Sequence, residues 1–286
     1  MRTILIAAVS IASFTVALAQ RGPAPPPPAP RAGAPIDLAG YWVSIVNEDW
    51  RWRMVTPQKG DYTSLPLNGE GRRAADVWDL TKDDASGNQC KAFGIGNIIR
   101  QPGRLHITWQ DDTTMKIDFD AGQQTRLLYF DRSKPPSGPK TWQGHSIAQW
   151  LRPGGRGGPA STIPGGADIA GTVPGGGGVG LRGGPPASRS LLEGGSLKVM
   201  TTNFREGYLR KNGVPYSENA SITEYFDRLP TYTDGSVWMV VSTVIDDPKY
   251  LAQSYTVSTH FRRELDGSKW NPSPCKTDPP GKITKK

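Results

Sequence analysis

The chain has 286 residues, 36% of them hydrophobic and 9% aromatic, and its 34 Lys and Arg against 26 Asp and Glu give a formal net charge of +8. Two cysteines are too few for a zinc-finger ligand set, and the basic residues form no stripe interleaved with stacking aromatics, which argues against a nucleic-acid platform. We interpret the charge as solvated surface with weak attraction to anionic polymers of a cell envelope.

The first 19 residues have the pattern of a signal peptide. Arg2 is followed by an apolar run from residue 4 to 18, and Ala17-Leu18-Ala19 matches an A-x-A cleavage site. A membrane anchor is the alternative, but the run is shorter than the ~20 apolar residues that a span needs. We therefore expect cleavage before Gln20, a secreted or periplasmic protein, and no transmembrane segment in the mature chain.

Residues 20–36 are rich in Pro and Ala, which predicts a disordered lead of polyproline character before a domain at 37–278. The domain opens with residues 39–54, which we expect to form one extended strand. In such a strand Trp50 and Trp52 share a face, and Arg51 and Arg53 share the other. The two tryptophans are then candidates for ligand binding, with packing in the core as the alternative.

The remaining chain alternates between short strands and turns. Asn68 is a candidate N-cap for one short helix at 70–78, and residues 83–89 and 205–218 are expected to be loops. Residues 152–188 are so rich in Gly that we expect a flexible insertion, and residues 279–286 form a basic tail. The predicted strands cover residues 105–109, 115–120, 125–130, 141–151, 196–204, 221–227, 237–245 and 254–262.

This pattern of elements predicts an all-β fold. About eight to ten strands in meander order favour a single closed antiparallel β-barrel, which leaves no exposed strand edges. If the protein is exported, a disulfide between Cys90 and Cys275 is expected, the alternative being two buried free thiols.

Several segments resemble a group of uncharacterised secreted bacterial proteins with a W-x-G-H-S, T-E-R-F and D-P pattern. The matching residues lie within about 85–250, and the chain departs from the pattern at Tyr225 and at the Gly-rich insertion. The resemblance supports the compartment and the fold, and carries no activity. Gly40-Tyr41-Trp42 is also similar to the Gly-x-Trp opening of lipocalins. The matched segments are residues 142–150, 195–202, 213–217, 223–228 and 247–248.

The three histidines are His106, His145 and His260, each inside a predicted strand. Three imidazoles brought together would make a Zn or Cu site, but no local spacing supports this, and we expect neither a metal nor another cofactor. His145 or His260 with Glu224 could serve as an acid–base pair. Ser146 lies next to His145 on a strand and so faces the other side, which argues against a Ser/His nucleophile.

Arg126 and Glu224 are charged residues in otherwise apolar strands. If these strands face the barrel interior, the two charges need partners, and we expect them to pair with each other or with a nearby His or Tyr. The pair either fixes the register of the strands or acts as a polar handle for a ligand. Together with Trp50, Trp52, Trp142 and His145, these two residues form the predicted ligand-binding set.

The favoured hypothesis is an exported, lipocalin-like barrel that binds a small or hydrophobic molecule in its mouth. One alternative is an envelope hydrolase or isomerase that uses the His/Glu pair, and another is a scaffold or assembly protein. A cavity with few polar groups favours binding, a His–carboxylate pair in a cleft favours an enzyme, and a filled interior favours a scaffold.

Overall fold

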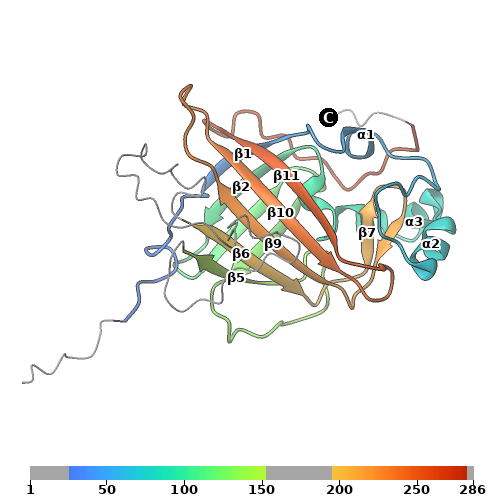
Figure 1. The fold of residues 1–286 in the computed structure, drawn as a ribbon, viewed down its shortest axis with the longest axis horizontal. Coiled ribbons are helices and arrows are strands. Elements are labelled where there is room, and N and C mark those ends of the chain that lie inside the picture. Colours follow the sequence, from blue (N-terminus) through green and yellow to red (C-terminus); the bar gives the residue numbers. More distant parts are fainter. Residues whose placement is uncertain (1–25, 153–194, 282–286) are drawn as a thin grey trace, which may run out of the picture.

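The computed structural model describes residues 26–152 and 195–281, and its main feature is a closed barrel of nine strands (Figure 1). The prediction of an all-β barrel is therefore confirmed. Around the barrel the strands follow the order β1-β11-β10-β9-β6-β5-β4-β3-β2. Their bounds are β1 Gly40–Ile45, β2 Arg104–Trp109, β3 Thr114–Phe119, β4 Gln124–Tyr129, β5 His145–Leu151, β6 Ser196–Thr202, β9 Ser221–Arg228, β10 Trp238–Asp246 and β11 Tyr255–Glu264.

The prediction of a purely antiparallel barrel is wrong at one seam. Strands β4 and β5 run parallel, with Leu128 opposite Ser146 and Tyr129 opposite Ile147. The connection between them, residues 130–144, contains three prolines, which lack the backbone donor that a strand ladder needs. The connection therefore runs from the end of β4 to the opposite end of the barrel, where β5 begins, and the two strands do not form a hairpin.

Short elements cover one end of the barrel, which we call the helical end (Figure 1). The predicted helix is confirmed as α2, and Asn68 caps it by accepting a hydrogen bond from the Gly71 backbone N–H at 2.9 Å. The elements at or near this end are α1 Trp50–Arg53, α2 Gly69–Asp76, α3 Leu80–Ala85, the 3₁₀ turns η1 Gln89–Phe93 and η2 Ile98–Arg100, and the hairpin β7 Gly207–Arg210 with β8 Val214–Tyr216.

Three local predictions are wrong at this end. Strand β1 stops at Ile45, and the expected second half of the strand is the helical turn α1, so Trp50 and Trp52 do not share a strand face. The expected loop at 83–89 overlaps α3, which the Asp79 carboxylate caps. The expected loop at 205–218 contains β7 and β8, joined through Gly213 at φ +80°.

Gly213 is required at the β7–β8 turn for two reasons. Its positive φ is one that L side chains rarely adopt, and a Cβ placed there would lie 2.0 Å from Cγ of Trp78. The hairpin is therefore pressed against the segment that follows α2, which explains why such short strands persist.

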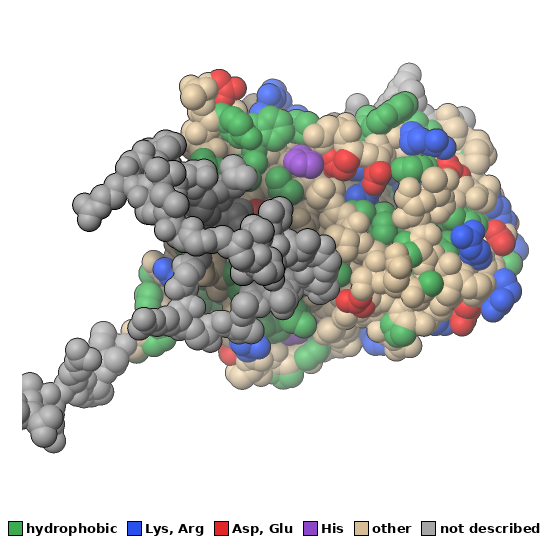
Figure 2. All heavy atoms as spheres, in the orientation of Figure 1, with side chains coloured by type: hydrophobic (Ala, Val, Ile, Leu, Met, Phe, Trp, Pro, Cys, Tyr) green, Lys and Arg blue, Asp and Glu red, His purple; other side chains and the backbone are tan. Residues whose placement is uncertain are grey.

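Two apolar cores fill the barrel and its helical end. One core lies inside the barrel and includes Trp42, Ile117, Leu128 and Phe226, all with 0% exposure. The other packs α2, β7 and β8 against the barrel and includes Tyr216. On the face shown in Figure 2, Lys and Arg side chains are intermixed with Asp and Glu over the end that carries α2 and α3, as expected for a solvated surface.

Part of the predicted lead contacts the barrel. Residues 26–36 lie at the end opposite the helices (Figure 1), where the Trp150 indole donates to the Pro30 carbonyl at 2.9 Å. Arg31 donates its backbone N–H to the Asp112 carbonyl at 3.1 Å, and Ile36 is buried in the barrel core. These residues differ from the expectation of a disordered lead, because the lead's carbonyls and its one large apolar side chain find partners on the barrel.

The two cysteines form the predicted disulfide, with a Cα–Cα distance of 5.1 Å. Cys90 lies in η1 and Cys275 in the segment after β11, so the bridge joins residues that are 185 positions apart. The predicted signal peptide at 1–19 and nearly all of the Gly-rich insertion at 152–188 lie outside the described residues, as does most of the basic tail. Across the described ranges, no helix combines the length and the apolar character needed to cross a membrane.

Candidate functional site

A layer of polar side chains crosses the barrel interior between the two apolar cores. Inward-facing residues alternate along each strand, and on seven of the nine strands one of them is polar at this level. The layer consists of Ser44, Arg126, Ser146, Thr201, Glu224, Thr243 and Thr259. Apart from Ser44, which is partly exposed, these residues are buried, so the barrel encloses hydrogen-bonding groups at its centre.

Arg126 and Glu224 form an ion pair in this layer. The Arg126 Nη2 atom lies 2.5 Å from the Glu224 Oε2 atom, and both side chains have 0% exposure. Arg126 also donates to the Ser146 hydroxyl at 3.0 Å and to the Thr201 hydroxyl at 2.7 Å. The predicted interior pairing is confirmed, and the role of the pair in ligand binding stays a prediction.

The layer keeps hydrogen-bonding capacity that no described residue uses. Arg126 Nη1, Glu224 Oε1 and the hydroxyls of Thr243 and Thr259 are buried and have no hydrogen-bond partner among the described residues. Buried polar groups are rarely left without partners, so we expect ordered water to join them. In this arrangement the ion pair mainly links β4 to β9 across the barrel.

His145 and Trp142 lie outside the barrel interior. Ser146 faces inward, so its neighbour His145 faces outward, where it stacks on Tyr129 with ring centroids 5.1 Å apart. Trp142 packs under the Arg205 guanidinium at 3.9 Å. The structure therefore does not bring these two residues to Glu224.

The tryptophans of α1 are separated as well. Trp50 is 63% exposed, whereas Trp52 packs against Arg210 and donates its indole N–H to Asp61 at 3.0 Å. The predicted ligand-binding set is thus divided between the barrel interior, the barrel exterior and the helical end, and it does not form one site.

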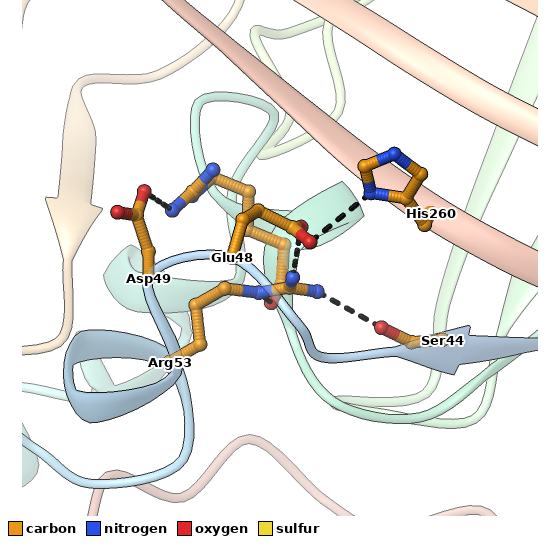
Figure 3. A network of polar contacts seen from close by, with 6 residues as sticks. Ser44, Glu48, Asp49, Arg53 and His260 are labelled. Carbon is orange, nitrogen blue, oxygen red and sulfur yellow. Dashed lines mark hydrogen bonds and ion pairs between the residues drawn. The ribbon is translucent and has the colours of Figure 1, made fainter.

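His260 pairs with a carboxylate that the sequence analysis did not select. Its Nδ1 atom lies 3.1 Å from the Glu48 Oε2 atom, and Glu48 also pairs with Arg53 (Figure 3). Arg53 in turn donates to the Ser44 hydroxyl at 2.9 Å. This chain of contacts connects the outer face of β11 to the interior polar layer without involving Glu224.

His106 lies apart from the other two histidines. It stacks on Tyr41 with ring centroids 3.9 Å apart, and burial lowers the pKa of its imidazole. Among the described residues, no group of three or more His, Cys, Asp or Glu side chains is placed to hold a metal ion.

An aromatic cluster lies at the barrel end opposite the helices, which we call the mouth. Trp109, Phe130 and Trp150 are partly buried and pack on the barrel core. The Phe130 centroid lies 5.4 Å from the centroids of both Trp109 and Trp150, and the two indoles are 6.5 Å apart. The residues come from β2, β5 and the end of β4, so the parallel β4–β5 seam helps to bring them together.

A cavity of about 580 Å³ adjoins this cluster, between the barrel and residues 27–33 of the lead. Phe130, Trp150 and Ala148 form its barrel side, and Pro27, Pro28 and Pro30 lie on the lead side. Arg132 and Arg152 add positive charge, and Arg152 donates to the Gly33 carbonyl. This site was not predicted from the sequence, although strand parity alone places Phe130 on the face of Arg126 and Leu128.

Comparisons of the chain with protein-family models, curated proteins and solved structures found no match.

Proposed function

We propose that this chain is an exported β-barrel protein that binds a small, largely apolar molecule at the barrel mouth. The observation that carries the proposal is the cavity of about 580 Å³ beside Phe130 and Trp150. Small-molecule sites are typically ~300–1,000 Å³ and combine apolar walls with a few polar groups. The mouth cavity has this size and composition.

The residues around the cavity suggest the chemistry of the ligand. Phe130 and Trp150 offer aromatic faces, and the prolines of the lead add apolar surface without backbone donors. Arg132 and Arg152 are positioned to attract a negative group on the same molecule. We therefore favour a ligand with an apolar or aromatic body and one acidic group.

The packing of the barrel favours the mouth over the interior. The apolar core inside the barrel is filled by side chains such as Trp42, Leu197 and Phe261, each at most 1% exposed. A filled interior was the expectation for a scaffold, but the cavity lies where the filled region ends. Binding at the mouth needs no rearrangement of this core.

Export is the second part of the proposal. The Cys90–Cys275 disulfide supports it, because disulfides persist mainly in oxidising compartments. N-terminal sequencing of the protein recovered from the periplasm or the medium should begin at Gln20, and recovery of a chain that begins at Met1 would contradict export with cleavage.

Binding can be tested with 1-anilinonaphthalene-8-sulfonate, an aromatic anion with the chemistry proposed here. In isothermal titration calorimetry we expect one site per chain, and we expect Trp150→Ala to weaken binding at least about tenfold, since truncating a central aromatic anchor can cost ~2 kcal/mol or more. The matched control is Trp238→Ala, because Trp238 packs on Tyr232 and is not one of the residues that line the cavity.

Equal affinity of the wild-type protein and the Trp150→Ala variant would contradict the mouth site. Thermal unfolding of each variant must show one cooperative transition, because the same probe also binds to partly folded states.

A further inference from the structure

The helical end contains a cluster of buried guanidinium groups that the mouth site does not involve. Arg53, Arg100 and Arg210 are each at most 4% exposed. Arg53 comes from α1, Arg100 from η2 and Arg210 from β7, so the fold brings three distant segments of the chain together here. A charge buried to this extent needs a partner, because removing it from water is costly.

Two carboxylates serve these three cations. Glu48 pairs with Arg53, and Asp49 pairs with Arg100 at 2.6 Å between Oδ2 and Nη2 (Figure 3). Arg210 forms no ion pair with any described residue within 4.0 Å, by contrast with its two neighbours. These three arginines and two carboxylates together carry one more positive than negative charge, and Lys211 and Asp278 add one charge of each sign nearby.

The guanidinium of Arg210 is held against an aromatic ring, but its hydrogen-bond donors are not all used. Its Cζ atom lies 4.3 Å from the centroid of the Trp52 ring, which covers one face of the group. Its Nε, Nη1 and Nη2 atoms are buried without a hydrogen bond to any described residue, and Arg100 Nη1 is in the same state. Apart from an interaction with the Tyr255 side chain, the four donor nitrogens on these two arginines are thus available.

The electrostatics of Arg210 agree with this geometry. Burial lowers the pKa of its guanidinium, Tyr255 (through its charge and a side-chain hydrogen bond) and Asp49 raise it, and the positive charge of Arg100 has the smallest effect and lowers it. Arg210 and Arg100 are therefore close enough to repel each other, and Asp49 compensates for only part of their combined charge.

We propose that Arg210 and Arg100 bind a small tetrahedral oxyanion, phosphate or sulfate, at the helical end of the barrel. Oxyanions accept several hydrogen bonds from the edges of guanidinium groups, and those edges stay free when an aromatic ring covers a face. A bound anion supplies the charge that the third arginine lacks. It also partners the four buried nitrogens.

The burial of Arg210 selects the free ion over an ester. Arg210 is only 3% exposed, so an anion bound to it would be enclosed, which disfavours the organic part of a phosphate ester. An enclosed site favours the smaller inorganic ion. The anion is therefore held as part of the folded structure, and the segment with α1 must move for the anion to exchange, because α1 carries both Trp52 and Arg53.

The test is the thermal unfolding of the full mature protein in phosphate, sulfate, acetate or chloride at equal ionic strength. An anion that binds only the folded state raises the melting temperature, by roughly 5–10 °C when its concentration is 100 times Kd. We expect this shift with phosphate or sulfate, little with acetate, and none with chloride. Glycerol phosphate should raise the melting temperature less than inorganic phosphate does.

Arg210→Met should abolish the phosphate-dependent shift. Arg104→Met is the matched control and should retain it, because Arg104 is bonded to Glu264 through Nε at 2.7 Å and lies outside the cluster. If Arg210→Met does not fold, calorimetric titration of the wild-type protein with phosphate still decides the question. The proposal would be overturned if phosphate changed the melting temperature of the wild-type protein no more than chloride does. It would also be overturned if phosphate raised the melting temperature of Arg210→Met as much as that of the wild type.

Discussion

Replacing Glu224 with Gln should lower the free energy of unfolding by about 3–5 kcal/mol, since the change leaves the Arg126 cation buried without its counter-charge. Both side chains have 0% exposure, so water cannot solvate the remaining charge in the folded state. The Arg126→Met change should cost a similar amount, because it leaves Glu224 alone. Urea unfolding of each variant measures the loss.

The double variant Arg126→Met/Glu224→Gln should lose much less than the sum of the two single variants. The matched control is Lys140→Met with Glu218→Gln, a pair 2.7 Å apart whose side chains are 41% and 54% exposed. Its coupling should fall in the range of ~0–1 kcal/mol that is typical of surface pairs. Coupling near zero for the buried pair would remove it as a link across the barrel.

Removing the disulfide should have the next largest effect. The Cys90→Ser/Cys275→Ser variant should unfold with a free energy about 2–4 kcal/mol lower than the wild type, because the bridge restricts a chain of 185 residues in the unfolded state. The bridge also holds the segment after β11 against η1. Urea unfolding with and without reductant, compared with the double variant, measures this contribution.

Intact mass after alkylation provides the control for that experiment. The non-reduced wild type should take up no alkylating reagent, and the reduced protein should take up two equivalents. Two alkylated thiols in the non-reduced protein would contradict the bridge.

The strands and their inward faces could be predicted from the sequence, because a period of two in apolar residues leaves little freedom once one face is buried. Glu224 lies between Ile222 and Phe226, and this parity alone placed it inside the barrel. The pairing with Arg126 followed from the cost of burying a single charge.

The helical end could not be predicted in the same way. Residues 50–53 alternate Trp and Arg, which is typical of a strand, but Asp49 adopts φ 52° and the chain turns into α1. The short strands β7 and β8 depend on contacts with Trp78 rather than on local preference. Tertiary contacts override a local pattern of this kind.

The mouth site was missed for a topological reason. Trp109, Phe130 and Trp150 are each recognisable as inward-facing residues, but their meeting depends on the β4–β5 seam and on a lead that returns over the barrel. The prolines of residues 130–144 argue against a hairpin but do not specify a parallel pairing, and the return of the lead has no local sequence signal. Charged residues were predicted as site residues instead, because their need for a partner can be inferred without knowledge of the topology.

The most direct test of binding at the mouth uses the indole N–H resonances of the nine tryptophans in a ¹H–¹⁵N NMR spectrum. The Trp150 indole reports on the site, because it adjoins the cavity and donates to the Pro30 carbonyl. On titration with 1-anilinonaphthalene-8-sulfonate, the resonances of Trp150 and Trp109 should shift, while those of Trp78 and Trp238 should stay in place. Shifts at Trp78 with none at Trp150 would contradict binding at the mouth.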